Sequence, residues 1–249
     1  MDKNTVIMKD LILNGSEKMN IALSGEQADE LIAYADLLVE WNEKINLTAI
    51  TDNEGIATKH FLDSLSAITT GYVNGRVIDV GTGAGFPGLV LKIAKPEIKL
   101  TLLDSLNKRV SFLRTVSDNL NLTGIEFVHA RAEDAGKNAE YRGKFDTVVS
   151  RAVANMAVLS EWCLPFLKIG GYFLALKGPL ADEELKDAKR AISILGGKIE
   201  DVKEIEIPFT ELNHKIIIVK KVRQTPMKYP RKPGISAKNP IGQCYNLRK

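Results

Sequence analysis

The sequence predicts an α/β fold, in which a mostly parallel seven-stranded sheet has an antiparallel edge and follows an N-terminal helical extension. Two observations predict this fold. Short apolar runs alternate with helical patterns from residue 76 onward, and the last two runs are close enough in sequence to pair antiparallel. Strands that alternate with helices form a parallel sheet covered on both faces. Within one structural domain we expect a helical extension (1–72), a core (73–222) and a basic tail (223–249).

The first 70 residues are expected to be helical. Ser24 and Gln27 have the spacing of a capping box, and apolar residues follow at helical intervals. This rhythm breaks over residues 42–51, where we expect a loop. Asp52 can then cap a second helix, which carries His60.

The elements of the core are expected in a fixed order, and functional side chains should gather where the parallel strands end. The expected strands are 77–80, 100–104, 125–129, 145–149, 172–176, 199–207 and 215–221. The expected helices are 87–95, a helix capped by Ser105 that continues to about residue 120, 156–167 and 182–195.

Composition excludes several classes of protein. Hydrophobic residues make up 45% and charged residues 26%, which is typical of a globular chain. The sequence contains no run of 18 apolar residues, so it predicts no membrane-spanning helix. Its first residues lack the pattern of a secretory signal. The two cysteines, Cys163 and Cys244, lack metal-site spacing, so we expect no metal and a cytoplasmic protein.

A glycine-rich loop follows the first strand of the core. Gly83, Gly85 and Gly88 match the G-x-G-x-x-G pattern of dinucleotide-binding folds, although this register begins late relative to the strand. Asp79 with Gly81, Gly83 and Gly85 gives D-x-G-x-G-x-G instead. That pattern resembles the first motif of class I S-adenosylmethionine-dependent methyltransferases, which have a Rossmann-like fold.

The chemistry of the loop favours the second pattern. A pyrophosphate requires backbone N–H groups and a helix N-terminus. S-adenosylmethionine has no phosphate but carries a sulfonium and an amino group, which suit an acid such as Asp79 beside the loop. A purely structural glycine turn is disfavoured because three alternating glycines cost conformational entropy.

Other candidate site residues end the later strands. Asp104 either accepts hydrogen bonds from a ribose or caps the next helix. Residues 132–134 either border an adenine or simply begin a helix with favourable acids. Arg151 either holds a phosphate or fixes its loop, and Lys177 either contacts nucleic acid or is solvated.

The sequence also limits the atom that could accept a methyl group. No Asn/Asp-Pro-Pro-Tyr/Phe motif follows the fourth strand, which argues against methylation of an exocyclic amino group. Cys163 lies in an apolar helix and suits a core position better than a nucleophile, and Cys244 has no catalytic setting. A ring nitrogen such as guanine N7 needs no general base, so positioning alone could supply much of the catalysis.

The C-terminal segment is purely basic. Residues 1–211 contain 24 Lys and Arg against 31 Asp and Glu, whereas residues 212–249 contain 10 Lys and Arg and no acid. This division indicates either a polyanionic partner or a solvated tail. Because Arg231, Lys232 and Lys238 lie among prolines, we expect an extended segment that contacts phosphates.

Five segments in order resemble bacterial ribosomal RNA small-subunit methyltransferase G, also called the glucose-inhibited division protein B family. The resemblance covers roughly residues 24–241, and the five segments are highly specific in combination. They are WNEKINLT (41–48), HFLDSL (60–65), GTGAGFPG (81–88), SRAVA (150–154) and RKPG (231–234). One departure is that Ile235-Ser236 stand where the family usually has Thr-Pro.

The resemblance implies transfer of a methyl group from S-adenosylmethionine to N7 of one guanine in small-subunit ribosomal RNA. We expect that RNA as partner, within a ribosomal particle, and a monomeric enzyme. The alternatives are another RNA or small-molecule methyltransferase, or a nonenzymatic RNA-binding protein.

The resemblance and the residue chemistry together give the candidate site. Carried over by the resemblance are the cofactor contacts Gly81, Phe86, Ala132, Glu133 and Arg151. The residue chemistry adds Asp79, Gly83, Gly85 and Asp104. The family pattern places the Asn46–Thr48 loop and His60 at the cleft, with Asn46 and His60 as the candidate residues. The expected RNA contacts are Lys177, Arg231, Lys232 and Lys238.

Overall fold

The computed structural model describes residues 3–151, 153–211 and 213–242, and Cys244 lies outside this part of the chain. The strands are β1 (Arg76–Val80), β2 (Lys99–Asp104), β3 (Ile125–His129), β4 (Phe145–Arg151), β5 (Leu167–Lys177), β6 (Gly197–Glu206) and β7 (Asn213–Lys221). The α-helices of the core and tail are α5 (Gly88–Ala94), α6 (Asn107–Asn119), α7 (Ala132–Ala135), α8 (Met156–Cys163), α9 (Ala181–Ile194) and α10 (Ile235–Lys238). A 3₁₀ turn, Leu164–Phe166, follows α8.

The strands form one sheet in the order β3-β2-β1-β4-β5-β7-β6. The first five strands are parallel, and β7 pairs antiparallel with both β5 and β6. The predicted α/β fold with an antiparallel edge is therefore confirmed. Chain order runs outward from β1 to β3 and then returns to β4, so the strand order reverses between β1 and β4. Ligands of such sheets bind where this reversal occurs, at the carboxyl ends of the strands.

The N-terminal segment consists of helices, as expected. They are α1 (Lys3–Lys18), α2 (Gly25–Ile45), α3 (Asn53–Gly55), a π-helix (Ile56–Leu62), α4 (Asp63–Leu65) and a 3₁₀ turn (Ser66–Thr70). Both hydrogen bonds of the predicted Ser24–Gln27 capping box are present. The Asp52 carboxylate accepts from the Gly55 backbone N–H at 2.7 Å and so caps the second helical segment.

Several boundaries differ from the sequence prediction. Strand β5 begins at Leu167, five residues before the expected start, and α8 ends at Cys163 and not at residue 167. Helix α2 continues to Ile45, into the range expected to be a loop, and it ends where the Asn42 side chain accepts from the backbone N–H groups of Leu47 and Thr48. Ser105 does not cap α6. The helix begins two residues later, and the Asp104 carboxylate accepts from the Leu106 N–H at 2.9 Å.

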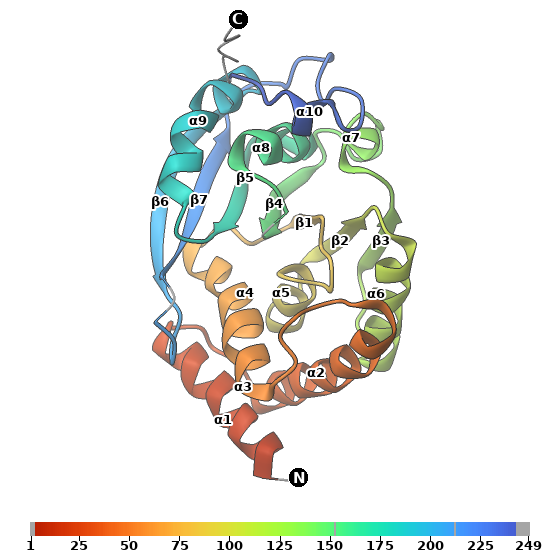
Figure 1. Cartoon of the computed structure of the whole chain (residues 1–249), viewed down its shortest axis with the longest axis vertical. Coiled ribbons are helices and arrows are strands. Elements are labelled where there is room, and N and C mark those ends of the chain that lie inside the picture. The colour runs from red at the N-terminus through yellow and green to blue at the C-terminus, as the bar shows by residue number, and fades with distance from the viewer. Residues whose placement is uncertain (1–2, 152, 212, 243–249) are drawn as a thin grey trace, which may run out of the picture.

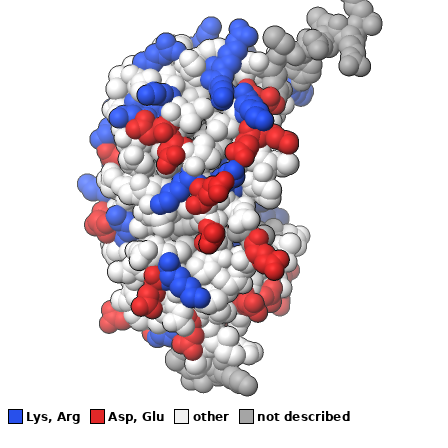
Figure 2. Space-filling model, turned by 90° about the vertical axis from the view of Figure 1, so that its left-hand side faces the viewer, with Lys and Arg blue, Asp and Glu red and all other residues white. Residues whose placement is uncertain are grey.

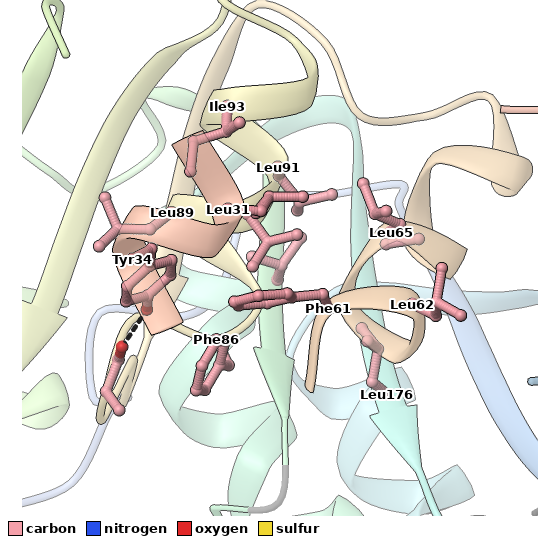
Figure 3. Close-up of a cluster of buried hydrophobic side chains, with 14 of the residues drawn as sticks. Leu31, Tyr34, Phe61, Leu62, Leu65, Phe86, Leu89, Leu91, Ile93 and Leu176 are labelled. Atoms are coloured by element: carbon pink, nitrogen blue, oxygen red, sulfur yellow. Dashed lines mark hydrogen bonds between the residues drawn. The ribbon is translucent and has the colours of Figure 1, made fainter. Parts of the chain in front are cut away.

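Helices cover both faces of the sheet (Figure 1). On one face α2, the π-helix, α5 and α6 share a continuous apolar core, and on the other face α8 and α9 share a second one. The N-terminal helices are thus packed onto the core. Figure 3 shows this packing around Tyr34 and Phe61, and the buried Tyr34 hydroxyl donates to the Ala84 carbonyl of the glycine-rich loop.

The surface over β6 and α9 carries both signs of charge. Figure 2 shows cationic and anionic side chains interspersed there, without a uniform basic face. Among the described residues, no helix is long and apolar enough to span a bilayer.

Candidate functional site

A cavity of about 1110 Å³ opens at the carboxyl ends of the parallel strands. The ends of β1, β2, β4 and β5 contribute to its wall, together with the loop after β3. Residues from the N-terminal helical segment and from the basic tail complete the wall. The cavity therefore lies at the reversal of strand order, where the sequence predicts the site.

Gly81 and Gly83 form part of the cavity wall, in the loop between β1 and α5. Both have a left-handed backbone, with φ of +73° and +61°. A Cβ atom added to Gly81 would lie 2.9 Å from the Val153 side chain, so this glycine permits a close approach of two loops. A Cβ added to Gly83 would meet nothing closer than a carbonyl oxygen at 4.0 Å. Gly83 thus keeps its edge of the cavity free of a side chain.

Neither Asp79, in β1, nor Gly85, in the loop, lies in the cavity wall, which corrects their predicted role as direct cofactor contacts. The Asp79 side chain is fully buried, and one of its oxygens accepts from the Gly88 N–H at 2.8 Å. Burial raises the pKa of Asp79 to about 7. A Cβ on Gly85 would collide with Tyr34 and Leu89, so this glycine serves packing.

Asp104 ends β2 at the cavity wall and is 3% exposed. One carboxylate oxygen accepts from the Gly83 N–H at 2.9 Å, and the other accepts from the Leu106 N–H. The Arg109 guanidinium lies 3.6 Å from the oxygen that accepts from Gly83. The other oxygen keeps a second acceptor position, because a carboxylate has about four lone-pair sites. The two roles considered for Asp104 are therefore compatible. Its carboxylate caps the start of α6 and can still accept a hydrogen bond from a ribose hydroxyl.

Ala132 and Glu133 also lie in the cavity wall, at the start of the short helix α7. The Glu133 carboxyl group is 4% exposed and accepts from the Gly234 backbone N–H of the tail at 3.2 Å. This contact joins the loop after β3 to the C-terminal segment.

Phe86, His60 and Arg151 are stacked together at the cavity wall. The rings of His60 and Phe86 have centroids 4.5 Å apart and planes inclined by 21°. The Arg151 guanidinium lies 4.9 Å from the Phe86 centroid, and it donates to His60 Nδ1 at 3.1 Å. Burial and the charge of Arg151 lower the pKa of His60 to about 4, so the imidazole is neutral near pH 7.

Two residues of this cluster, Asp63 and His214, were not predicted as functional. The Asp63 carboxylate accepts from Arg151 at 2.9 Å and hydrogen-bonds His214 Nδ1 at 2.7 Å. Burial would raise the pKa of Asp63, but the His214 hydrogen bond and Arg151 outweigh it, so the pKa lies below its usual value. The same hydrogen bond raises the pKa of His214. The sequence separations of 88 and 151 residues explain why no local pattern indicated this cluster.

Asn46 is not part of the cavity wall, which corrects its predicted position at the cleft. It is exposed and adopts a left-handed conformation (φ +49°) as the C-cap of α2. Thr48, at the other end of the predicted loop, does lie in the wall, and its hydroxyl is 2.8 Å from His60 Nε2.

Lys177 is a correction to the predicted RNA contacts. It lies at the cavity wall but is 7% exposed, and its ammonium donates to the Glu184 carboxylate at 2.7 Å and to the Ala154 carbonyl. Glu184 also accepts from the Met156 N–H. Lys177 therefore fixes the loop after β4 and the start of α8.

The basic tail is folded onto the core through residue 242 and is not the extended arm that the prolines suggested. Arg231 forms a bidentate ion pair with Glu161 of α8, whose side chain is completely buried. The Trp162 indole donates to the Ser236 hydroxyl at 2.9 Å. Gly234 and Ala237 consequently contribute to the cavity wall. Arg231 is engaged in holding the tail, whereas Lys232 and Lys238 remain exposed.

These residues fit S-adenosylmethionine. Gly83 leaves the wall open, and Asp104 offers acceptors to hydroxyl groups. The Thr82 side chain lies in the same wall and interacts with the buried Asp79 carboxyl group of β1, which holds the loop on the strand beneath it.

Two further features concern other chemistries. Cys163 is fully buried, and burial raises the pKa of its thiol well above the usual value, which confirms it as a core residue. The described part of the chain contains no group of three or more His, Cys, Asp or Glu that could hold a metal ion.

Comparisons with known proteins give consistent results. A family model described as rRNA small subunit methyltransferase G matches residues 27–213. The ribosomal RNA small subunit methyltransferase G of Alkaliphilus metalliredigens is 51% identical over 235 residues, which cover 94% of this chain and 98% of the relative. The protein of the same name from Acetivibrio thermocellus is 50% identical over 242 residues, 97% of this chain and 100% of the relative.

Solved structures share the fold at low sequence identity. TrmN from Thermus thermophilus has a TM-score of 0.50 and 18% identity, with coverage of 67% of this chain and 53% of that chain. A SAM-dependent methyltransferase from Methanosarcina mazei has a TM-score of 0.50 and 15% identity, with coverage of 63% and 98%.

Proposed function

The chain belongs to the ribosomal RNA small subunit methyltransferase G family, and from this premise we propose that it methylates N7 of one guanine in 16S ribosomal RNA, with S-adenosylmethionine as the methyl donor. The observation that carries the proposal is the cavity at the strand reversal, with a glycine edge at Gly83 and the Asp104 carboxylate beside it. Both features suit an adenosine-containing donor.

The donor's adenosine is assigned to the wall formed by β2 and the loop after β3. Asp104 accepts hydrogen bonds from the ribose hydroxyls, and Ala132 and Glu133 border the adenine. Gly83 lets the backbone approach the donor without a side chain between them, and Gly81 beside it lets Val153 pack against the loop. When bound, S-adenosylmethionine supplies an electrophilic methyl group on a positively charged sulfur.

Arg151 and Phe86 are assigned to the centre of the cavity. Arg151 is held by Asp63, by the Lys59 carbonyl and by His60, so its charge has a fixed position. Such preorganised groups orient a bound ligand without a cost of reorganisation during the reaction.

The acceptor chemistry suits a ring nitrogen. Arg151 donates to one nitrogen of His60, and the other nitrogen is engaged with Thr48. Burial and Arg151 also lower the pKa of His60 to about 4, which makes it a poor general base near neutral pH. Guanine N7 carries a lone pair and no proton, so its methylation requires in-line positioning and no base.

The finer partner assignments belong to the same proposal. Lys232 and Lys238 are exposed on the folded tail beside the cavity and are assigned to RNA phosphates. We further propose that the enzyme acts as a monomer on a ribosomal particle in the cytoplasm.

Two measurements test the proposal. Calorimetry should show binding of S-adenosylmethionine and none of NAD. Incubation of small-subunit RNA or subunits with the protein and labelled S-adenosylmethionine should yield 7-methylguanosine after digestion to nucleosides. A product methylated on carbon or on an exocyclic nitrogen would contradict the N7 assignment, and tight binding of NAD alone would contradict the choice of donor.

A further inference from the structure

The hydrogen bonds between Arg151, His60 and Thr48 have a fixed direction. A guanidinium can only donate, so His60 Nδ1 must accept from Arg151 at 3.1 Å. The imidazole is neutral, and its single ring proton therefore lies on Nε2. That nitrogen is 2.8 Å from Thr48 Oγ1 and must donate to it.

Thr48 Oγ1 has a second donor. The backbone N–H of Ile50 donates to it at 3.0 Å. A hydroxyl has two acceptor lone pairs and one proton, so both lone pairs are occupied. The hydrogen bonds of the described residues provide no acceptor for the Thr48 proton, and Thr48 lies in the cavity wall. The hydroxyl can therefore only donate, and it is available to a ligand in the cavity.

The position of Thr48 assigns it to the acceptor rather than the methyl donor. The residues assigned to the donor lie at strand ends and in the glycine-rich loop, whereas Thr48 and His60 come from the N-terminal helical segment. None of the residues assigned to the methyl donor comes from this wall of the cavity, so the wall is available to the methyl acceptor.

We infer that Thr48 is a specificity-determining residue, whose hydroxyl donates a hydrogen bond to O6 of the target guanine. This inference rests on the proposed function. O6 and N7 lie side by side on the same edge of guanine and are both acceptors, whereas adenine presents an amino donor in place of O6. Because the Thr48 hydroxyl cannot accept, an adenine would leave two donors facing each other without a partner. A site that pairs a substrate polar group rejects an analogue that lacks it.

The experiment compares guanine with 2-aminopurine, which keeps N7 but lacks O6, at the target position of semisynthetic small-subunit RNA. Single-turnover methylation is measured at saturating S-adenosylmethionine for the wild type, Thr48→Val and Thr48→Ser. The wild type and Thr48→Ser are expected to methylate 2-aminopurine at least about tenfold more slowly than guanine. Thr48→Val is expected to methylate guanine about tenfold more slowly than the wild type, with a guanine to 2-aminopurine ratio near one.

The ratio of the guanine rate to the 2-aminopurine rate compares two substrates of the same variant. A general loss of loop structure slows both reactions and leaves this ratio unchanged. Equal rates of the wild type on both RNAs would overturn the inference, as would a wild-type ratio in Thr48→Val. A tenfold loss of S-adenosylmethionine affinity in Thr48→Val with an unchanged ratio would assign the hydroxyl to the methyl donor and also overturn it. If Thr48→Val does not fold, Thr48→Ala supplies the same ratio. Absence of 7-methylguanosine from wild-type reactions on guanine RNA would instead contradict the proposed function itself.

Discussion

Gly83 is the residue at which access of the methyl donor depends on a missing side chain. Gly83→Val would place a branched group at the open edge of the cavity, so we expect S-adenosylmethionine binding to be lost in calorimetry. The left-handed backbone should also cost about 1–3 kcal/mol of stability. Gly170→Val is the matched control, because Gly170 has φ of +89° and equally open space but lies outside the cavity wall. Equal loss of donor binding in both variants would show that strain, and not occlusion, is responsible.

His60 should make the free energy of unfolding depend on pH, and the direction of its pKa shift fixes the sign of that dependence. In the folded protein its pKa is lowered to about 4 by burial and Arg151, so between pH 6.5 and 4 the unfolded chain binds a proton that the folded chain does not. The contribution of His60 to stability is therefore present at pH 7 and lost as the pH falls. In urea melts, the unfolding free energy of the wild type relative to His60→Gln should decrease by about 2 kcal/mol between pH 7 and pH 5.

The other perturbed groups do not obscure this comparison. His214 and Asp79 both have raised pKa values, but both are present in the wild type and in His60→Gln, so their titration cancels in the difference between the two proteins. Parallel pH profiles for the wild type and His60→Gln would contradict the buried neutral imidazole.

The individual site residues were partly predictable. Gly81, Gly83 and Asp104 could be located from the sequence because each lies at or just after the end of a strand, and local apolar runs marked those strands. The Asn46–Thr48 loop was located at the cleft, but Asn46 itself was wrongly singled out as the candidate residue, because it is the left-handed C-cap of α2 and its side chain is exposed. Asp63 and His214 were missed because only the tertiary fold brings them to Arg151.

At the scale of elements, the tail is anchored by one buried ion pair. Arg231→Ala leaves the completely buried Glu161 carboxylate without its guanidinium, which typically costs about 3–5 kcal/mol. Because Gly234 and Ala237 form part of the cavity wall, we expect a lower melting temperature together with weaker S-adenosylmethionine binding. Thermal denaturation and calorimetry measure both.

The matched control for the tail anchor is Lys232→Ala, which removes an exposed cation one residue away and should change neither quantity. The double variant Glu161→Gln/Arg231→Met should recover part of the lost stability, since it removes both charges. If Arg231→Ala is as stable and binds the donor as tightly as the wild type, the tail is not held by this pair.

Most elements followed the sequence because each signal was local, but β5 begins five residues before the apolar run that predicted it. Apolar runs marked the strands, and the Ser24–Gln27 capping box marked the start of α2. The tail differed from the predicted extended segment because its fold depends on Glu161. Glu161 lies 70 residues before Arg231, and no local sequence pattern connects the two residues. The division into segments 1–72, 73–222 and 223–249 stays a prediction.

At the scale of the whole molecule, RNA affinity is expected to depend on exposed cations of the folded tail. Lys232→Ala/Lys238→Ala should weaken binding of small-subunit RNA and reduce the slope of log affinity against log salt by about 1–2. S-adenosylmethionine affinity should not change. Filter binding over a salt series tests this, and an unchanged slope would remove these lysines from the RNA interface.

The central claim is that this fold delivers one methyl group to N7 of one guanine in 16S ribosomal RNA. Its most direct test is to incubate unmethylated small-subunit RNA or subunits with the enzyme and S-adenosylmethionine, reduce the RNA, cleave it with aniline and map the breaks. We predict a single cleavage site that appears with the wild type and is absent with Gly83→Val. A methylated RNA that aniline does not cleave, or cleavage at many guanines, would contradict the account.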